Sequence, residues 1–422
     1  MSQQLTCQNF IIFYNLPSGR VPIITQVLYK NQDLSVQIQN LVSSTLIGVV
    51  KTQPFYEQVI FHPNFENFCF EIWNDIVALK SHDPSLAISI ADFFFQHCCI
   101  FYWNLIINVG SKNQACAYLE KMCELVTKWE KSTKKRIHKG TPFYFLTFVY
   151  RELGDIDSAF ASAFRAINED KKSLDPLFGL GSYKNSPAYK YVSLRDDPSN
   201  YLYREVLEIR TLIDRYRREY EVNVKHSLPL SDIDVKFLQG KGKLDQIGHF
   251  FVYTLEEMNK YLKQSPVLPD NDFYRFKNIR EIFNFCLITD KILEYRYKRR
   301  FLNYNPNNEM YISDGIMLYF DDKRYIPRLN SSEKRSLRRH IQTNPPLPKT
   351  PKELVNNLFL NPVLYTFKRQ NLRPEMRYLL FAHHLRNIGA HDLQKDNIFV
   401  SNYELITKWL IFSIFAAIEA LT

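Results

Sequence analysis

Hydrophobic positions along most of this chain recur at intervals of three and four residues, the spacing of a helix that buries one face. Residues 113–131 show this pattern, with Ala117, Leu119, Met122, Cys123 and Val126 on the apolar side. The preceding residues 85–109 are apolar almost throughout, which predicts a long helix buried on all sides. Residues 1–80 alternate aromatic-rich segments with polar breaks, and we interpret them as short helices. The pattern therefore predicts a mainly α protein.

A pair of helices with small packing residues is expected at residues 141–170. Thr141 and Pro142 predict the start of the first helix, and Gly154-Asp155 divides it from the second. Small side chains in the second helix allow the two helices to approach closely. The arrangement resembles one tetratricopeptide repeat at the positions Phe143, Leu146, Tyr150, Gly154, Ala159, Ala166 and Ile167. One repeat cannot bury its own face, so neighbouring helices should complete an irregular helical-repeat domain.

Breaks in the pattern divide the chain into three parts. Residues 1–200 form the tetratricopeptide-like domain, residues 201–270 a helical connector, and residues 271–422 a C-terminal domain that follows a proline-containing stretch. The C-terminal domain is expected to be an up-and-down bundle of helices. It carries one predicted insertion at residues 309–320, where two β-rich arms flank Ser313-Asp314-Gly315, a composition that suits a small β-hairpin.

Composition narrows the class of protein further. The chain has 422 residues, 45% of them hydrophobic and 15% aromatic, so a disordered protein is excluded. The seven cysteines include no CxxC pair, which argues against a disulfide framework or a zinc site and favours the cytoplasm. We see no signal peptide, and the apolar run between Lys408 and Glu419 is too short to span a bilayer. We therefore expect no membrane association, no metal and no cofactor.

Positive charge is concentrated near the C-terminus. Residues 271–422 carry 24 Lys and Arg against 15 Asp and Glu, whereas the first 270 residues carry 30 against 29. A basic domain attracts polyanions, although basic runs are also common on solvated helix faces. The distribution indicates that RNA, if it is a partner, binds the C-terminal domain.

The segment "FAHHLRNIGAHD", residues 381–392, places Arg386, Asn387 and His391 near the end of an expected helix that starts at Pro374. On an ideal helix Arg386 and His391 lie about 140° apart around the axis. They converge only if the helix ends or distorts at Gly389, or if a second chain completes the site.

This arginine-asparagine-x3-histidine arrangement resembles the motif of the HEPN superfamily. The resemblance covers roughly residues 271–422, and it implies a helical bundle with the motif on the second-last or last helix. It also implies a metal-independent endoribonuclease that acts as a homodimer of the prokaryotic toxin or antiviral defence type. In HEPN toxins that pair with a nucleotidyltransferase antitoxin, a tyrosine often follows the histidine by two residues; here Leu393 stands there, which argues against that regulation.

The residue types suit RNA cleavage without a metal. The ribose 2′-hydroxyl attacks phosphorus, a group that titrates near neutral pH moves protons, and a fixed cation stabilises the phosphoryl charge. His391 and Arg386 fit these roles, and Asn387 is expected to orient His391 or to bind phosphate. The products would carry a 2′,3′-cyclic phosphate or a 3′-phosphate, and a 5′-hydroxyl. The expected RNA-binding residues are Arg373, Arg377, His384, Lys395, Arg335, Arg338 and Arg339.

The sequence is also compatible with two other functions. The C-terminal bundle can be a non-catalytic module that dimerises or binds RNA, or the whole chain can be a helical-repeat scaffold. In the leading hypothesis the N-terminal domain senses a trigger or binds a protein partner and restrains the nuclease. His383 falls on the apolar stripe of its helix and is expected in the core or in an interface.

Overall fold

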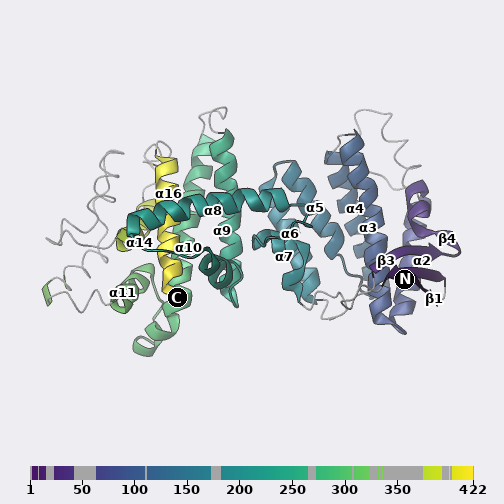
Figure 1. Cartoon of the computed structure of the whole chain (residues 1–422), viewed down its shortest axis with the longest axis horizontal. Helices are drawn as coiled ribbons and strands as arrows, with labels where there is room; N and C mark the ends of the chain where they lie inside the picture. Colours follow the sequence, from purple (N-terminus) through teal and green to yellow (C-terminus); the bar gives the residue numbers. More distant parts are fainter. Residues whose placement is uncertain are drawn as a thin grey trace. The chain divides into compact units, whose positions relative to one another are not determined.

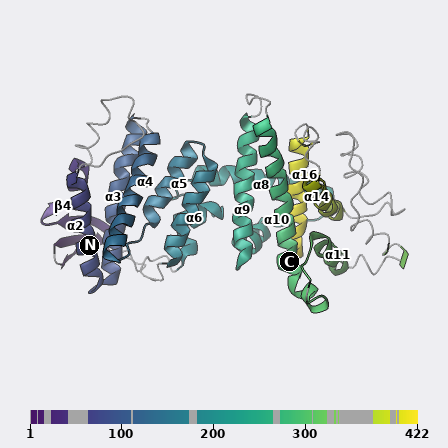
Figure 2. The same ribbon diagram turned by 180° about the vertical axis from the view of Figure 1, so that it is seen from behind.

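The computed structural model shows a mainly helical protein (Figures 1 and 2). It describes residues 2–7, 9–15, 23–41, 63–109, 112–172, 182–264, 272–306, 308–323, 331–332, 335, 374–391, 399 and 402–421. The chain divides into two compact units. Unit 1 comprises Met1–Val192 and Asp197–Leu202, and unit 2 comprises Ser193–Asp196 and Tyr203–Thr422. The chain passes from one unit to the other between Val192 and Tyr203.

Unit 1 begins with an antiparallel sheet, so the interpretation of residues 1–80 as short helices was wrong for this segment. The strands are β1 (Ser2–Cys7), β2 (Phe10–Asn15), β3 (Ile23–Tyr29) and β4 (Gln32–Asp33), in the order β1-β2-β3-β4. Phe10 pairs with Tyr29 and Ile12 with Val27, and all four side chains are buried. This two-residue alternation of buried positions is the signal of a strand with one face in the core.

Helices complete the core of unit 1. They are α2 (Pro63–Lys80), α3 (Pro84–Val109), α4 (Lys112–Thr133), α5 (Gly140–Glu152), α6 (Ile156–Lys172), the short η2 (Tyr183–Asn185) and α7 (Pro187–Val192). Trp73 of α2 lies at the centre, with its ring centroid about 6 Å from those of Phe94, Phe95 and Trp129. Large aromatic side chains from three helices thus supply much of the buried apolar area of this unit.

Helices α5 and α6 form the expected helix pair and pack against each other. Ala159 and Ala166 of α6 are buried, as is Leu146 of α5. Gly154 in the connecting turn has φ of 76°, a backbone conformation that glycine adopts without a steric penalty. The first helix begins at Gly140, with Lys139 as its N-cap, so Thr141 does not cap it.

Unit 2 is entirely helical in the part of it that the structure describes. Its elements are α8 (Tyr203–Val224), the π-helix η3 (Asp232–Leu238), α9 (Lys243–Gln264), α10 (Asp272–Tyr304), α11 (Ile312–Asp322), α14 (Pro374–His391), α16 (Tyr403–Ile418) and η7 (Glu419–Leu421). α8 packs against α16, and α9 packs against α10. We expected residues 201–270 to form a connector, but α8, η3 and α9 of this segment belong to the same unit as the C-terminal helices.

The terminal helix α16 is the centre of unit 2. It packs against α10, α14 and α8 (Figures 1 and 2), and every residue from Leu410 to Ala420 is buried. The helix is apolar on all its faces because helices pack against it on several sides. Among the helices that the structure describes, this one included, none is both long and apolar enough to cross a membrane.

The predicted β-hairpin at residues 309–320 is wrong, because residues 312–322 form helix α11. Ile312, Ile316 and Tyr319 are buried, at helical spacing. Asp314 is not a turn residue: its carboxylate accepts a hydrogen bond of 2.9 Å from the backbone N–H of Tyr311 and stabilises the start of the helix. Gly315 allows close packing, since a Cβ there would lie 2.9 Å from Cβ of Leu293.

Candidate functional site

Helix α14 carries the arginine-histidine motif and is held by apolar contacts along its first half. Met376, Leu379 and Leu380 are buried. The ring of Tyr378 lies 5.2 Å from that of Phe412 on α16, and Phe381 lies 5.9 Å from Trp409. These contacts fix the rotation of α14 about its axis, which decides the direction in which Arg386 faces.

Arg386 forms an ion pair with Asp290 of α10. Its Nη1 atom lies 3.0 Å from Oδ2 of Asp290; the arginine side chain is 39% exposed and the aspartate side chain 9%. The guanidinium carries five N–H donors, so one carboxylate contact leaves it able to bind a second anion. Asp290 therefore holds Arg386 in place at the edge of the bundle.

The surroundings of Asp290 are mostly apolar. Burial raises the pKa of Asp290, whereas the nearby Arg386 acts to lower it. Cys286, one turn earlier on α10, is also buried, and burial raises the pKa of its thiol. Next to Asp290, the Thr289 hydroxyl lies 2.7 Å from the hydroxyl of Ser413 on α16. A carboxylate in such a place needs a cation, and Arg386 supplies it.

Sequence reasoning missed Asp290. The available signal was an acidic residue on the apolar stripe of a helix, beside the buried Ile288, Thr289 and Ile292. Acidic residues are rarely buried without a partner, so the position indicates a basic residue on a neighbouring helix. The sequence does not specify which arginine pairs with Asp290.

The helix does not stop at Gly389. α14 continues to His391, which contradicts the expectation that Gly389 ends or loosens it. Along a continuous helix, positions 386 and 391 lie about 140° apart around the axis. The side chains of Asn387 and His391 lie outside what the structure describes. The backbone of one chain thus does not bring positions 386 and 391 to one face.

The two other histidines of the motif segment are inside unit 2. His383 is 4% exposed and His384 is 1% exposed, and their rings lie 5.4 Å apart. The core position of His383 agrees with its place on the apolar stripe. For His384 the expectation of a substrate contact was wrong, because its ring faces the protein interior in this structure.

The remaining residues expected to bind RNA are only partly described. Arg335 is exposed, and Arg377 on α14 is half-buried. Arg373, Lys395, Arg338 and Arg339 lie outside the described residues. The basic surface predicted from the sequence therefore has one exposed member in the described part, and its role stays a prediction.

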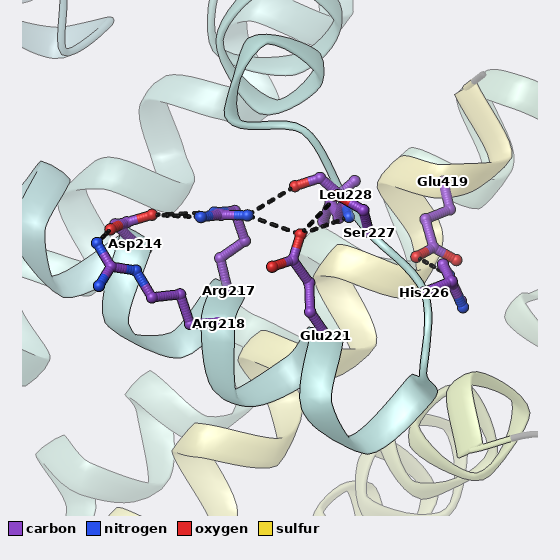
Figure 3. Close-up of polar contacts among 8 residues, drawn as sticks. All are labelled: Asp214, Arg217, Arg218, Glu221, His226, Ser227, Leu228 and Glu419. Atoms are coloured by element: carbon purple, nitrogen blue, oxygen red, sulfur yellow. Dashed lines mark hydrogen bonds and ion pairs between the residues drawn. The ribbon is translucent and has the colours of Figure 1, made fainter.

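A chain of polar contacts connects the end of α8 to the loop that follows it (Figure 3). Arg217 pairs with Asp214 at 2.7 Å and with Glu221 at 2.6 Å, and it also donates to the carbonyl of Leu228. Glu221 in turn accepts hydrogen bonds from the backbone N–H of Leu228 and from Ser227. Arg217 is half-buried, so this network fixes the loop more firmly than surface pairs do.

The same loop contacts the C-terminal turn through His226. Its Nε2 atom lies 2.6 Å from Oε1 of Glu419 in η7 (Figure 3). Burial raises the pKa of Glu419; His226 acts to lower it, and the Glu375 carboxyl at the start of α14 raises it. The start of α14 and the end of the chain therefore lie in one electrostatic environment.

A second buried carboxyl of α10, Glu281, lies among α9, α10 and α16. The Tyr403 hydroxyl of α16 donates to it. Burial raises the pKa of Glu281 to about 7, and the neighbouring Glu257 of α9 raises it while Lys277 and Arg280 lower it. This group can hold or release a proton near neutral pH.

Among the side chains that the structure describes, no group of three or more His, Cys, Asp or Glu residues is arranged to hold a metal ion. The geometry that the described residues do provide is an arginine fixed by a buried aspartate on a basic, helical unit. Comparisons of the chain with protein-family models, with curated proteins and with solved structures found no match.

Proposed function

We propose that unit 2 is a metal-independent endoribonuclease of the HEPN type, belonging to a prokaryotic toxin or antiviral defence system. The observation that carries the proposal is the Arg386–Asp290 ion pair. It holds a partly exposed guanidinium on α14, which precedes α16 in the chain, five residues before a histidine on the same helix. The positive charge of residues 271–422 supports a polyanionic substrate.

In the proposed reaction, the ribose 2′-hydroxyl attacks the adjacent phosphorus and the 5′-oxygen leaves. His391 moves the protons, and Arg386 stabilises the charge that builds on the phosphoryl oxygens. Asp290 is a positioning residue, since it contacts Arg386 and not the RNA. The products are a 2′,3′-cyclic phosphate and a 5′-hydroxyl.

The continuous course of α14 favours a dimeric site. Because positions 386 and 391 face different directions in one chain, Arg386 of one protomer would act with His391 of the other. The terminal helix α16 is buried within its own unit from Leu410 to Ala420, so this apolar surface is not free for a dimer contact. Phe276 and Leu287, 58% and 38% exposed, lie on one side of α10, the helix that also carries Asp290. We assign the dimer contact to that side.

The test uses the full chain. Purified protein is incubated with a fluorescent single-stranded RNA in EDTA, and the ends of the products are analysed. Cleavage should occur, give cyclic phosphate ends, and fall at least about 100-fold in His391→Ala, the scale of a lost general acid or base. Growth arrest on expression, relieved by the same substitution, should accompany it. Cleavage that requires a divalent metal, or that survives the substitution, would falsify the proposal.

The dimer is tested separately. Sedimentation of the full chain at micromolar concentration should show a dimer, and Phe276→Glu/Leu287→Glu should give a monomer that no longer cleaves RNA. A monomeric wild-type protein that still cleaves would contradict the shared site but not the chemistry. Glu404→Lys, an exposed position on α16, is the matched control.

A non-catalytic function has one specific observation in its favour. Arg386 is already paired with a buried carboxylate, an arrangement that also occurs where an arginine serves only to hold two helices together. In that case unit 2 binds RNA or a second copy without cleaving. RNA binding with no cleavage product, unchanged by His391→Ala, would support this second function.

The N-terminal unit has a regulatory role in this proposal. The α5–α6 pair has the buried alanines expected of a tetratricopeptide-like unit, and such repeats commonly bind protein segments. We propose that unit 1 receives the signal, or binds the partner protein, that restrains or releases the nuclease. Point substitutions on the surface of unit 1 in the full chain, with RNA cleavage as the readout, test this role.

A further inference from the structure

Two cavities follow one another along α3 in unit 1, each of about 330 Å³. The first is lined by Ala87 and Ala91 of α3, and the second by Asp92 and Gln96. His138, in the segment before α5, borders both. Since a helix rises 1.5 Å per residue, the two cavities together extend about 14 Å along α3. Because His138 borders both, the two cavities adjoin beside α3, and we refer to them together as the groove.

The first cavity has a positive lining. Lys80 at the end of α2, Arg136 before α5 and Lys172 at the end of α6 come from three different segments. Glu169 pairs with Arg136 at 2.8 Å and lies 3.7 Å from Lys172, so one carboxylate faces at least two of these cations. The rest of the lining is mostly apolar. An anionic group with two or three acceptor oxygens matches this end of the groove.

The second cavity has an aromatic wall. Tyr144 and Phe145 of α5 line it together with Tyr201. The ring of Tyr201 lies 5.7 Å from that of Phe145 and 6.3 Å from that of Tyr144, with which it is stacked. Tyr201 is nevertheless 52% exposed. A half-exposed ring beside a cavity offers a surface on which a planar ligand can stack.

Polar groups of fixed orientation complete the second cavity. Thr141 donates a hydrogen bond to Asp92, and Nε2 of His138 lies 2.7 Å from Oδ1 of Asp170. Gly140 makes room for the latter pair, because a Cβ there would lie 2.4 Å from Cε1 of His138 and 2.7 Å from Oδ1 of Asp170. These groups combine hydrogen-bond donors and acceptors, as the edge of a nucleobase and a ribose require.

We propose that this groove binds a nucleotide, with its phosphate in the cation-lined cavity and its base against Tyr201. Neither half alone indicates this ligand: a cationic cavity accepts many anions, and an aromatic wall accepts many planar groups. The cation-lined cavity and the aromatic-walled cavity lie within about 14 Å along α3, so together they fit a molecule with an anionic end and a planar, hydrogen-bonding end. The site is independent of the nuclease proposed for unit 2.

The test measures binding of the four ribonucleoside 5′-monophosphates to the full chain by isothermal titration calorimetry. At least one should bind more tightly than both its nucleoside and inorganic phosphate. Arg136→Gln/Lys172→Gln should weaken that nucleotide at least about 10-fold, since each charge-assisted hydrogen bond contributes on this scale. Tyr201→Ala should weaken the nucleotide and the nucleoside alike, but not phosphate.

Lys121→Gln/Lys135→Gln is the matched control, because it removes the same charge from exposed positions of unit 1 outside the groove. It should leave binding unchanged. The proposal is overturned if none of the four nucleotides binds at about 1 mM. It is also overturned if phosphate alone binds as tightly as the nucleotide, or if the control weakens binding as much as the groove variants do. Circular dichroism of each variant separates lost binding from lost folding.

Discussion

Two groups of charged side chains, one in each unit, lie in different settings. In unit 1, Arg136 and Lys172 border a cavity, where they share the carboxylate of Glu169 and are also accessible to water. In unit 2, Asp290 and Glu281 lie inside the helical bundle, where the protein itself must satisfy them. A charge at an open cavity has water as an alternative partner, whereas a buried one does not. Substitutions in unit 1 should therefore affect binding first, and substitutions in unit 2 should affect stability and chemistry together.

This difference changes how the motif must be tested. Replacing Arg386 removes a proposed catalytic cation and also leaves Asp290 buried without its partner. Loss of activity alone would then not distinguish a catalytic role of Arg386 from a role in the stability of unit 2. Activity and stability must therefore be measured on the same variants.

The largest expected effect is that of Arg386→Ala on RNA cleavage, a loss of at least about 100-fold. The same substitution should lower the free energy of unfolding of unit 2 by about 2 kcal/mol, less than for a fully buried pair because Arg386 is partly exposed. Asp290→Asn/Arg386→Ala should recover most of that stability and none of the activity. Denaturation curves and cleavage assays on the same preparations supply both values. Recovery of activity in the double variant would show that Arg386 is only structural.

The second prediction concerns pH. The pKa of Glu281 is about 7 in the folded protein and about 4.5 in an unfolded chain, so the folded state binds this proton more tightly. The free energy of unfolding of unit 2 should therefore fall as pH rises from about 4.5 to about 7, by up to about 3 kcal/mol, and level off above. Hydrogen exchange of α10 amides at several pH values reports this unit by itself.

Glu281→Gln should abolish that slope and make unit 2 more stable than the wild type at pH 8, since glutamine keeps a hydrogen-bond acceptor for Tyr403 without the charge. Glu404→Gln, an exposed carboxyl on α16, serves as the control and should leave the slope as it is. An unchanged slope in Glu281→Gln would assign the pH dependence to another group.

The third prediction addresses the basic surface of the C-terminal region. Arg335→Gln/Arg338→Gln/Arg339→Gln should weaken RNA binding by about 10-fold and reduce its salt dependence, because fewer counterions are released. The rate of cleavage at saturating RNA should change little. Filter binding at several salt concentrations gives affinity and slope together. The charge-matched control on unit 1 replaces Lys121, Lys128 and Lys131 with glutamine. Equal effects of both triple variants would indicate non-specific attraction.

The smallest effect is expected in the α5–α6 turn. Gly154→Ala places a side chain at a φ of 76° and should destabilise unit 1 by about 1 kcal/mol. Gly154→Asn should cost less, since asparagine tolerates this conformation better. Thermal denaturation of the three proteins gives the order. No loss in Gly154→Ala would mean that the turn can rearrange.

The helical class and the α5–α6 helix pair could be predicted from the sequence, because both rest on the local spacing of apolar residues. The sheet at residues 2–33 was missed because Phe10, Ile11, Ile12 and Phe13 are all apolar, so the sequence shows no two-residue period there; the alternation of buried and less buried positions is seen only in the structure. Helix α11 was misjudged because Ser313-Asp314-Gly315 suits a turn as well as a helix start, and only the packing of Gly315 on Leu293 decides between them.

Tertiary structure decided the rest of the candidate site. No local pattern pairs Arg386 with Asp290, which are 96 positions apart in sequence. The burial of His384, the course of α14 through Gly389 and the groove around His138 likewise depend on neighbours that are distant along the chain. Spacing in a sequence specifies which face of a helix a residue occupies, but what that face meets is set by the packing of the whole unit.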